Sequence, residues 1–160
     1  LDPSRKIGVQ MAEFLRLHQS VSKKDMLCLC EQAIIQAGLT DTKRVLNSRP
    51  YQLSGGMLQR VLIALAIAGK ARLVIADEPT TALDAVHRDQ AVEQFLKLRE
   101  QGCAILIVTH DFDVARHMGG HVLIMKEGRM VERGSAKEVL KNPKAGYTKE
   151  LIEAIHLGWG

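Results

Sequence analysis

The chain has 160 residues, of which 46% are apolar and 25% are charged, a balance typical of one globular domain with a hydrophobic core. It carries 22 basic and 18 acidic residues, a net charge of +4, and the Lys and Arg residues are scattered, which favours a solvated surface over a nucleic-acid face. The longest strongly apolar stretch, Val61 to Ala68, is far shorter than the ~20 residues that cross a bilayer, so we expect any membrane role to come through a partner.

The first ~45 residues are predicted to form a small helical unit without strands. Apolar residues recur at helical spacing from Ile7 to His18. Ser22 begins a second helix, with Asp25 at the spacing of a capping box, and Gly38 ends it.

The pattern changes after Pro50 and predicts helices that alternate with short strands. Helices are expected over Met57–Ala68, Ala85–Glu100, about Val114–His117 and Thr148–Ile155. Buried strands are expected over Leu73–Ala76 and Ala104–Val108, a hairpin over His121–Arg133, and a second capping box at Ser135 and Glu138. This order implies an α/β fold with a parallel sheet, whose functional sites lie beyond the carboxyl ends of the strands.

Two adjacent carboxylates, Asp77 and Glu78, follow the first strand. Consecutive side chains diverge there, so one can hold a hydrated magnesium ion while the other orients or deprotonates an attacking water. A strand that simply ends at a polar turn before Pro79 explains the pair equally well.

Ser54-Gly55-Gly56 precedes an apolar helix, and exposed amides at such a start suit an anion such as phosphate. Taken singly, an ordinary serine cap is the plainer interpretation. His110 follows the second strand, where it can bind a phosphate oxygen or serve only the structure. The other five histidines show no metal-ligand spacing and are interpreted as surface or packing residues: His18, His87, His117, His121 and His156.

Cysteine usage indicates a reduced, cytosolic compartment. The chain has three cysteines, Cys28, Cys30 and Cys103, an odd number without the spacing of a disulfide framework. Cys28 and Cys30 point to different faces of a helix, which disfavours a metal site between them.

Taken together, the motifs resemble those of ABC ATPases, which are P-loop NTPases. Leu53 to Arg60 resembles the signature motif, and Leu73 to Glu78 resembles the Walker B strand. Thr81-Ala82-Leu83-Asp84 is similar to the D-loop, and His110 is similar to the switch histidine. The resemblance implies a helical subdomain over 1–50, the signature-to-switch part of the catalytic core over 51–120, and a carboxyl-terminal hairpin and helices over 121–160.

Further details resemble the dipeptide, oligopeptide and nickel importer branch. These are Leu1-Asp2-Pro3 with Ile7-Gly8, and Asn142-Pro143 with Tyr147-Thr148. Met57 in the signature is more similar to the nickel importer subunit. The implied partners are transmembrane permease subunits and no nucleic acid, at the cytoplasmic face of the inner membrane.

The sequence contains no GxxxxGK[ST] loop, which in such enzymes wraps the phosphates of ATP. We therefore expect the amino-terminal part of the ATPase domain, with the Q-loop, to be absent here and the chain alone to be inactive.

The resemblance implies a head-to-tail dimer with a second ABC ATPase subunit. Ser54, Gly55, Gly56 and Gln59 would then contact ATP held by the partner, and Asp84 would act across the dimer. Asp77 would hold Mg²⁺ through water, Glu78 would be the general base, and His110 would stabilise the terminal phosphate. An ABC ATPase of DNA repair and a non-enzymatic interaction module remain the alternatives.

Overall fold

The computed structural model describes residues 1–18, 22–81 and 83–157. It divides into two compact units, Leu1–Val108 and Thr109–Gly160, each of which is described by itself. Among the described residues, no helix is long and apolar enough to span a membrane.

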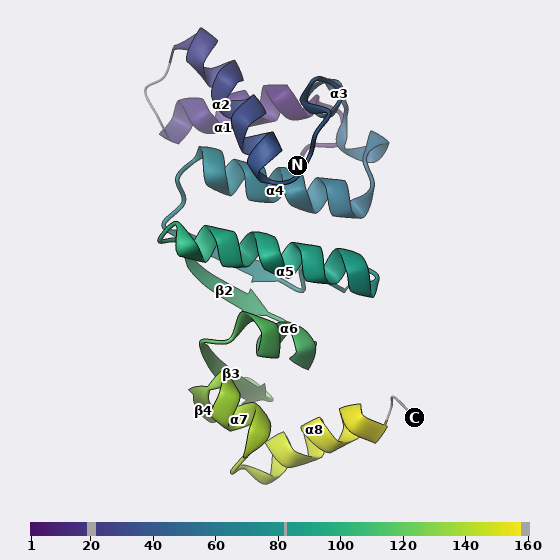
Figure 1. The fold of residues 1–160 in the computed structure, drawn as a ribbon, viewed down its shortest axis with the longest axis vertical. Coiled ribbons are helices and arrows are strands. Elements are labelled where there is room, and N and C mark those ends of the chain that lie inside the picture. Colours follow the sequence, from purple (N-terminus) through teal and green to yellow (C-terminus); the bar gives the residue numbers. More distant parts are fainter. Residues whose placement is uncertain (19–21, 82, 158–160) are drawn as a thin grey trace. The chain divides into compact units, whose positions relative to one another are not determined.

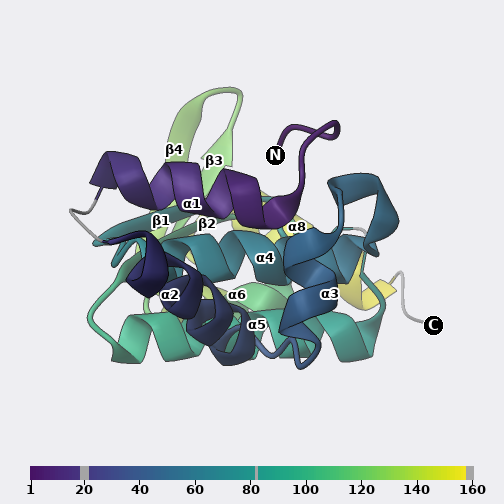
Figure 2. The same ribbon diagram turned by 90° about the horizontal axis from the view of Figure 1, so that it is seen from above.

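The first unit begins with a group of helices, α1 (Ile7–His18), α2 (Lys23–Gln36) and α3 (Thr42–Asn47), followed by a 3₁₀ turn η1 (Pro50–Gln52). α1, α2 and α3 lie on one side of α4 (Gly55–Ala68), and α5 (Ala85–Glu100) lies on the other (Figure 1). Figure 2 looks down on the same helices. The buried face of α1 consists of Ile7, Met11 and Leu15, all fully enclosed. The prediction that the first ~45 residues are helical and contain no strand is confirmed for the described residues.

The predicted parallel pairing is also confirmed, between β1 (Leu73–Asp77) and β2 (Ala104–Val108). Leu73 lies opposite Ala104, and Asp77 lies opposite Val108. The prediction that both strands are buried is wrong, because alternate residues on each strand are exposed, Ile75 by 65% and Leu106 by 47%. α5 packs against β2 and covers one face of that strand. Because successive side chains of a strand point to opposite faces, every second residue lies on the uncovered face and is exposed.

Serine and aspartate caps explain where several helices begin. The Ser22 hydroxyl accepts the Asp25 N–H at 3.3 Å and donates to the Asp25 carboxylate at 2.6 Å, and Ser135 and Glu138 repeat this pattern at the start of α7 (Ala136–Lys141). The N-cap half of each predicted capping box is therefore confirmed. The acidic side chain bonds the cap's hydroxyl, whereas in a full box it accepts the cap's backbone N–H.

The second unit contains α6 (Phe112–Met118), a hairpin and two helices. The predicted hairpin pairs β3 (His121–Lys126) with β4 (Arg129–Ser135) in antiparallel fashion around a turn at Glu127 and Gly128, both with positive φ. α8 (Gly146–Leu157) extends beyond the predicted helix at both ends. Its earlier start is stabilised by the Glu132 carboxylate, which accepts the N–H groups of Lys144 at 2.9 Å and Ala145 at 3.1 Å.

Candidate functional site

Ser54 and two glycines form the start of α4. The Ser54 hydroxyl accepts the Met57 N–H at 3.3 Å, so Ser54 is the N-cap and Gly55 and Gly56 are the first two helical residues. The helix thus begins two residues before the predicted Met57. The N–H groups and dipole at such a start favour a negatively charged ligand.

Neither glycine is required by the chain's own packing. A Cβ on Gly55 would meet nothing within 4 Å, and one on Gly56 would make only ordinary contacts, 3.8 Å from Cδ2 of His87 and 3.9 Å from Cδ2 of Leu83. Neither glycine has a positive φ. Glycine in a helix costs about 0.5–1 kcal/mol relative to alanine, so its use here points to a group that approaches from outside the chain.

Gln59, one turn into the same helix, is a second indication that this surface receives a group from outside the chain. Its side-chain nitrogen is buried and has no hydrogen-bond partner among the residues that the structure describes. A buried polar group without a partner costs about 1–3 kcal/mol. This end of α4 is therefore not optimised for the chain's own stability.

A strained turn positions Glu78 at the carboxyl end of β1. Its N–H donates to the carbonyl of Val108 at 2.8 Å, and its backbone adopts the left-handed region with φ 47°. The Thr81 hydroxyl donates to the Glu78 carboxylate at 2.7 Å. For a residue with a side chain the left-handed conformation costs about 1–2 kcal/mol, which these contacts offset. Glu78 is half-buried and Asp77 is exposed, so the two carboxylates occupy different environments.

Asp84 caps α5 and binds a histidine. Its carboxylate accepts the His87 N–H at 2.9 Å and contacts Nδ1 of the same residue at 2.8 and 2.9 Å. The backbone hydrogen bond and then the imidazole hold the pKa of Asp84 below its ordinary value. Ala82 of the predicted D-loop lies outside the described residues.

The predicted site residues fall into three places. Ser54, Gly55 and Gly56 share one end of the first unit with Leu83, Asp84 and His87. Asp77 and Glu78 share the turn after β1. His110 belongs to the second unit, where it is exposed just before Asp111, the N-cap of α6.

The chain offers oxygen ligands for Mg²⁺ but no complete cage. No group of three or more His, Cys, Asp or Glu residues suited to a metal occurs in the described part of the chain. Mg²⁺ ordinarily keeps several waters and takes one or two carboxylates together with phosphate oxygens of the substrate. The exposed carboxylate of Asp77 fits such a site, completed by water and phosphate.

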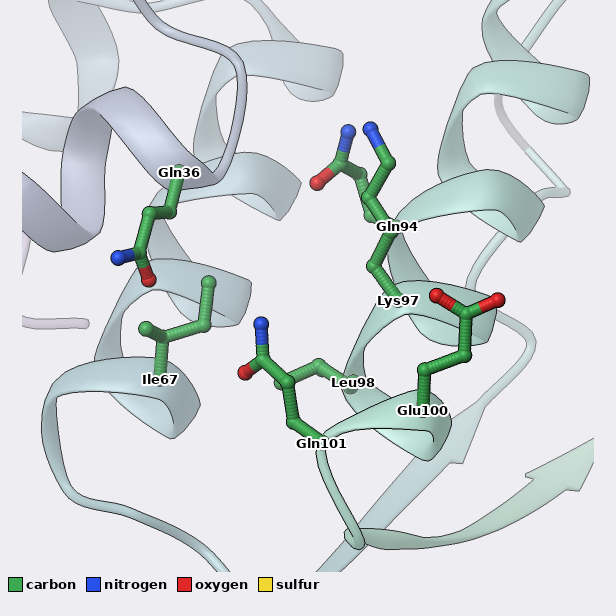
Figure 3. A pocket seen from close by; sticks show the side chains of 7 residues that line it. All are labelled: Gln36, Ile67, Gln94, Lys97, Leu98, Glu100 and Gln101. Carbon is green, nitrogen blue, oxygen red and sulfur yellow. The ribbon is translucent and has the colours of Figure 1, made fainter.

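A hollow of about 280 Å³ lies at the other end of α4 and α5 (Figure 3). Its lining is Gln36, Ile67, Gln94, Lys97, Leu98, Glu100 and Gln101. The carboxyl-terminal parts of both helices meet there, and Gly56 meets His87 at the opposite ends. α4 and α5 therefore run parallel, with their amino-terminal ends together and away from this hollow.

His87, which was predicted to be a surface or packing residue, lies beside both Gly56 and Asp84. Its spacing of three from Asp84 permitted the hydrogen bond. Its place beside Gly56 depends on how α4 packs against α5, which no local pattern reveals.

Several importer ATPase subunits are similar to this chain over most of its length. The metal-staphylopine import system ATP-binding protein CntD of Staphylococcus aureus is 41% identical over 152 residues, covering 94% of this chain and 56% of that protein. The oligopeptide transport protein OppD of Lactococcus lactis is 39% identical, covering 96% and 46%, and the dipeptide transport protein DppD of Haemophilus influenzae is 36% identical, covering 97% and 47%. The chain thus spans about half the length of these relatives.

The fold has a solved counterpart in the ATP-binding cassette MJ0796, whose dimer in a post-hydrolysis state was bound to ADP and Pi. The TM-score is 0.73 with 29% identity, covering 85% of this chain and 59% of that one. The family described as ABC transporter matches residues 2–81, half of the chain. The chain therefore belongs to the ABC transporter family, with importer ATP-binding subunits among its relatives.

Proposed function

We propose that the full-length protein hydrolyses ATP to energise an importer of peptides or metal. The observation that carries the proposal is the turn after β1, where a half-buried Glu78 is fixed by Val108 and Thr81 beside an exposed Asp77. Membership of the ABC transporter family and relatives named for peptide and metal import support the cargo classes.

Glu78 is the general base of this reaction. Its carboxylate accepts a hydrogen bond from Thr81, which sets its orientation, and a carboxylate can take a proton from an attacking water. Asp77 holds Mg²⁺ through water, where the ion neutralises phosphate charge. His110 stabilises the terminal phosphate.

The start of α4 binds the phosphates of an ATP that is held by a second ATPase subunit. Ser54, Gly55 and Gly56 present N–H groups and an open approach, the Gln59 side chain adds a further contact, and Asp84 acts across the dimer. A dimer is supported by the dimeric cassette among the structural relatives. The remaining partners are transmembrane permease subunits, which hold the protein at the cytoplasmic face of the inner membrane.

The test is the steady-state ATPase rate of the full-length protein with Glu78→Gln. The amide keeps the shape but cannot take a proton, so we expect the rate to fall about 100-fold or more. The control is Glu150→Gln on α8, an exposed glutamate, which we expect to leave the rate unchanged. A rate for Glu78→Gln within a few-fold of wild type would overturn the assignment.

A further inference from the structure

A histidine lies beside the start of the proposed phosphate-binding helix. Cδ2 of His87 is 3.8 Å from the position that a Cβ on Gly56 would occupy, so the imidazole borders the same opening as the glycine pair. α4 and α5 begin side by side at this end. Both helix dipoles therefore direct partial positive charge toward one place.

The imidazole is held in one orientation and keeps one nitrogen available. Nδ1 is bound to both oxygens of the Asp84 carboxylate, at 2.8 and 2.9 Å. Nε2, on the other side of the ring, has no hydrogen-bond partner within the described ranges, and the side chain is 54% exposed. With the Nδ1–H donating to the carboxylate, a ring that also carries a proton on Nε2 can donate that N–H to an anionic ligand.

We propose that His87 is a further phosphate-binding residue, donating from Nε2 to a terminal phosphate oxygen of the ATP that the start of α4 receives. The inference rests on the proposed function, because the ATP is supplied by the second subunit. It adds a side-chain N–H donor from α5 to the backbone N–H groups, the Ser54 hydroxyl and the Gln59 side chain at the start of α4. Asp84 is the positioning residue for this contact.

The test compares ATP and ADP in the full-length ATPase with His87→Ala. The N-cap survives this change, since Asp84 accepts the backbone N–H of residue 87. A charge-assisted hydrogen bond at an exposed site predicts a rise in KM for ATP of about five- to tenfold. We expect the inhibition constant for ADP, which lacks the terminal phosphate, to stay within twofold. His87→Lys, which supplies an N–H donor at the same place, should recover most of the lost affinity, and His121→Ala, which changes an exposed histidine of β3, should leave both constants unchanged.

Two outcomes overturn the inference. One is a KM for ATP within twofold of wild type in His87→Ala, and the other is an equal weakening of ATP and ADP, which a purely structural role would give. The Ser54→Ala variant distinguishes a failure of the His87 role from a failure of the proposed function. If that variant loses ATPase activity while His87→Ala does not, only the role of His87 fails. If neither variant affects the rate or KM, the proposed phosphate surface fails as well.

Discussion

Replacing Gly55 with alanine separates stability from function at the start of α4. The new Cβ would meet no atom of the chain within 4 Å, and the residue is helical without a positive φ. Alanine is favoured over glycine in a helix by about 0.5–1 kcal/mol, so Gly55→Ala should stabilise the protein by up to that amount. This corresponds to a rise in Tm of about 1–4 °C for a domain of this size.

The same substitution should impair ATP hydrolysis. The methyl group would occupy the opening through which a phosphate reaches the N–H groups, and a displacement near 1 Å can cost about 100-fold in rate. We expect a loss of about 10- to 100-fold in kcat/KM for ATP, measured on the full-length protein beside its thermal unfolding.

Gly146→Ala is the matched control for Gly55→Ala. Gly146 begins α8, has no atom within 4 Å of a built Cβ and lacks a positive φ. It should raise Tm by a similar amount and leave the ATPase rate unchanged. Full ATPase activity of Gly55→Ala would show that no external group needs the space beside this glycine. Destabilisation by more than about 1 kcal/mol would show that the space is not open. Either result would contradict the prediction.

Three further predictions concern packing, pH and nucleotide binding. Gly69→Ala should destabilise the protein by about 1–3 kcal/mol in urea unfolding, because its Cβ would lie 2.6 Å from Cε1 of Phe14; an unchanged midpoint would contradict this close contact. The backbone N–H groups of Lys144 and Ala145 donate to the Glu132 carboxylate and lower its pKa from its ordinary 4.5. Because the folded pKa is the lower one, the stabilisation is fully present above the unfolded pKa and is lost as pH falls through the folded pKa. Thermal unfolding at several pH values should show Glu132→Gln less stable than wild type at pH 7 and the two converging below pH 4.5, whereas a pH-independent difference would contradict the linkage. The 160-residue chain alone should bind ATP weakly or not at all in calorimetry, because its sequence lacks the GxxxxGK[ST] loop, and sub-micromolar affinity would contradict this.

Elements with strong periodicity were predicted well from the sequence. The bounds of α1, α5 and β2 match the prediction, since each has a clear cap, stop or apolar run. α3 and η1 were missed because they span only 6 and 3 residues, too few for a periodic pattern. The cap at Asp41, which accepts the Arg44 N–H at 3.1 Å, was the available signal for α3.

Candidate residues that are neighbours in the sequence, such as Asp77 and Glu78, could be placed together without the structure. The left-handed backbone of Glu78 was not foreseen, because it depends on pairing with Val108 from a strand 30 residues further along the chain. His87 was interpreted as a surface or packing residue for a related reason, since its meeting with Gly56 is a result of helix packing. Contacts of this kind depend on tertiary structure, which local pattern does not encode.

The central claim is that Glu78 of this chain drives cleavage of ATP bound between two ATPase subunits. The most direct measurement identifies the nucleotide that full-length Glu78→Gln retains. The protein is incubated with radiolabelled ATP and Mg²⁺ and separated from free nucleotide, and the retained nucleotide is then identified by chromatography. Wild type should yield ADP, while Glu78→Gln should retain intact ATP in a stable dimer. ADP formed by the variant at the wild-type rate would contradict it.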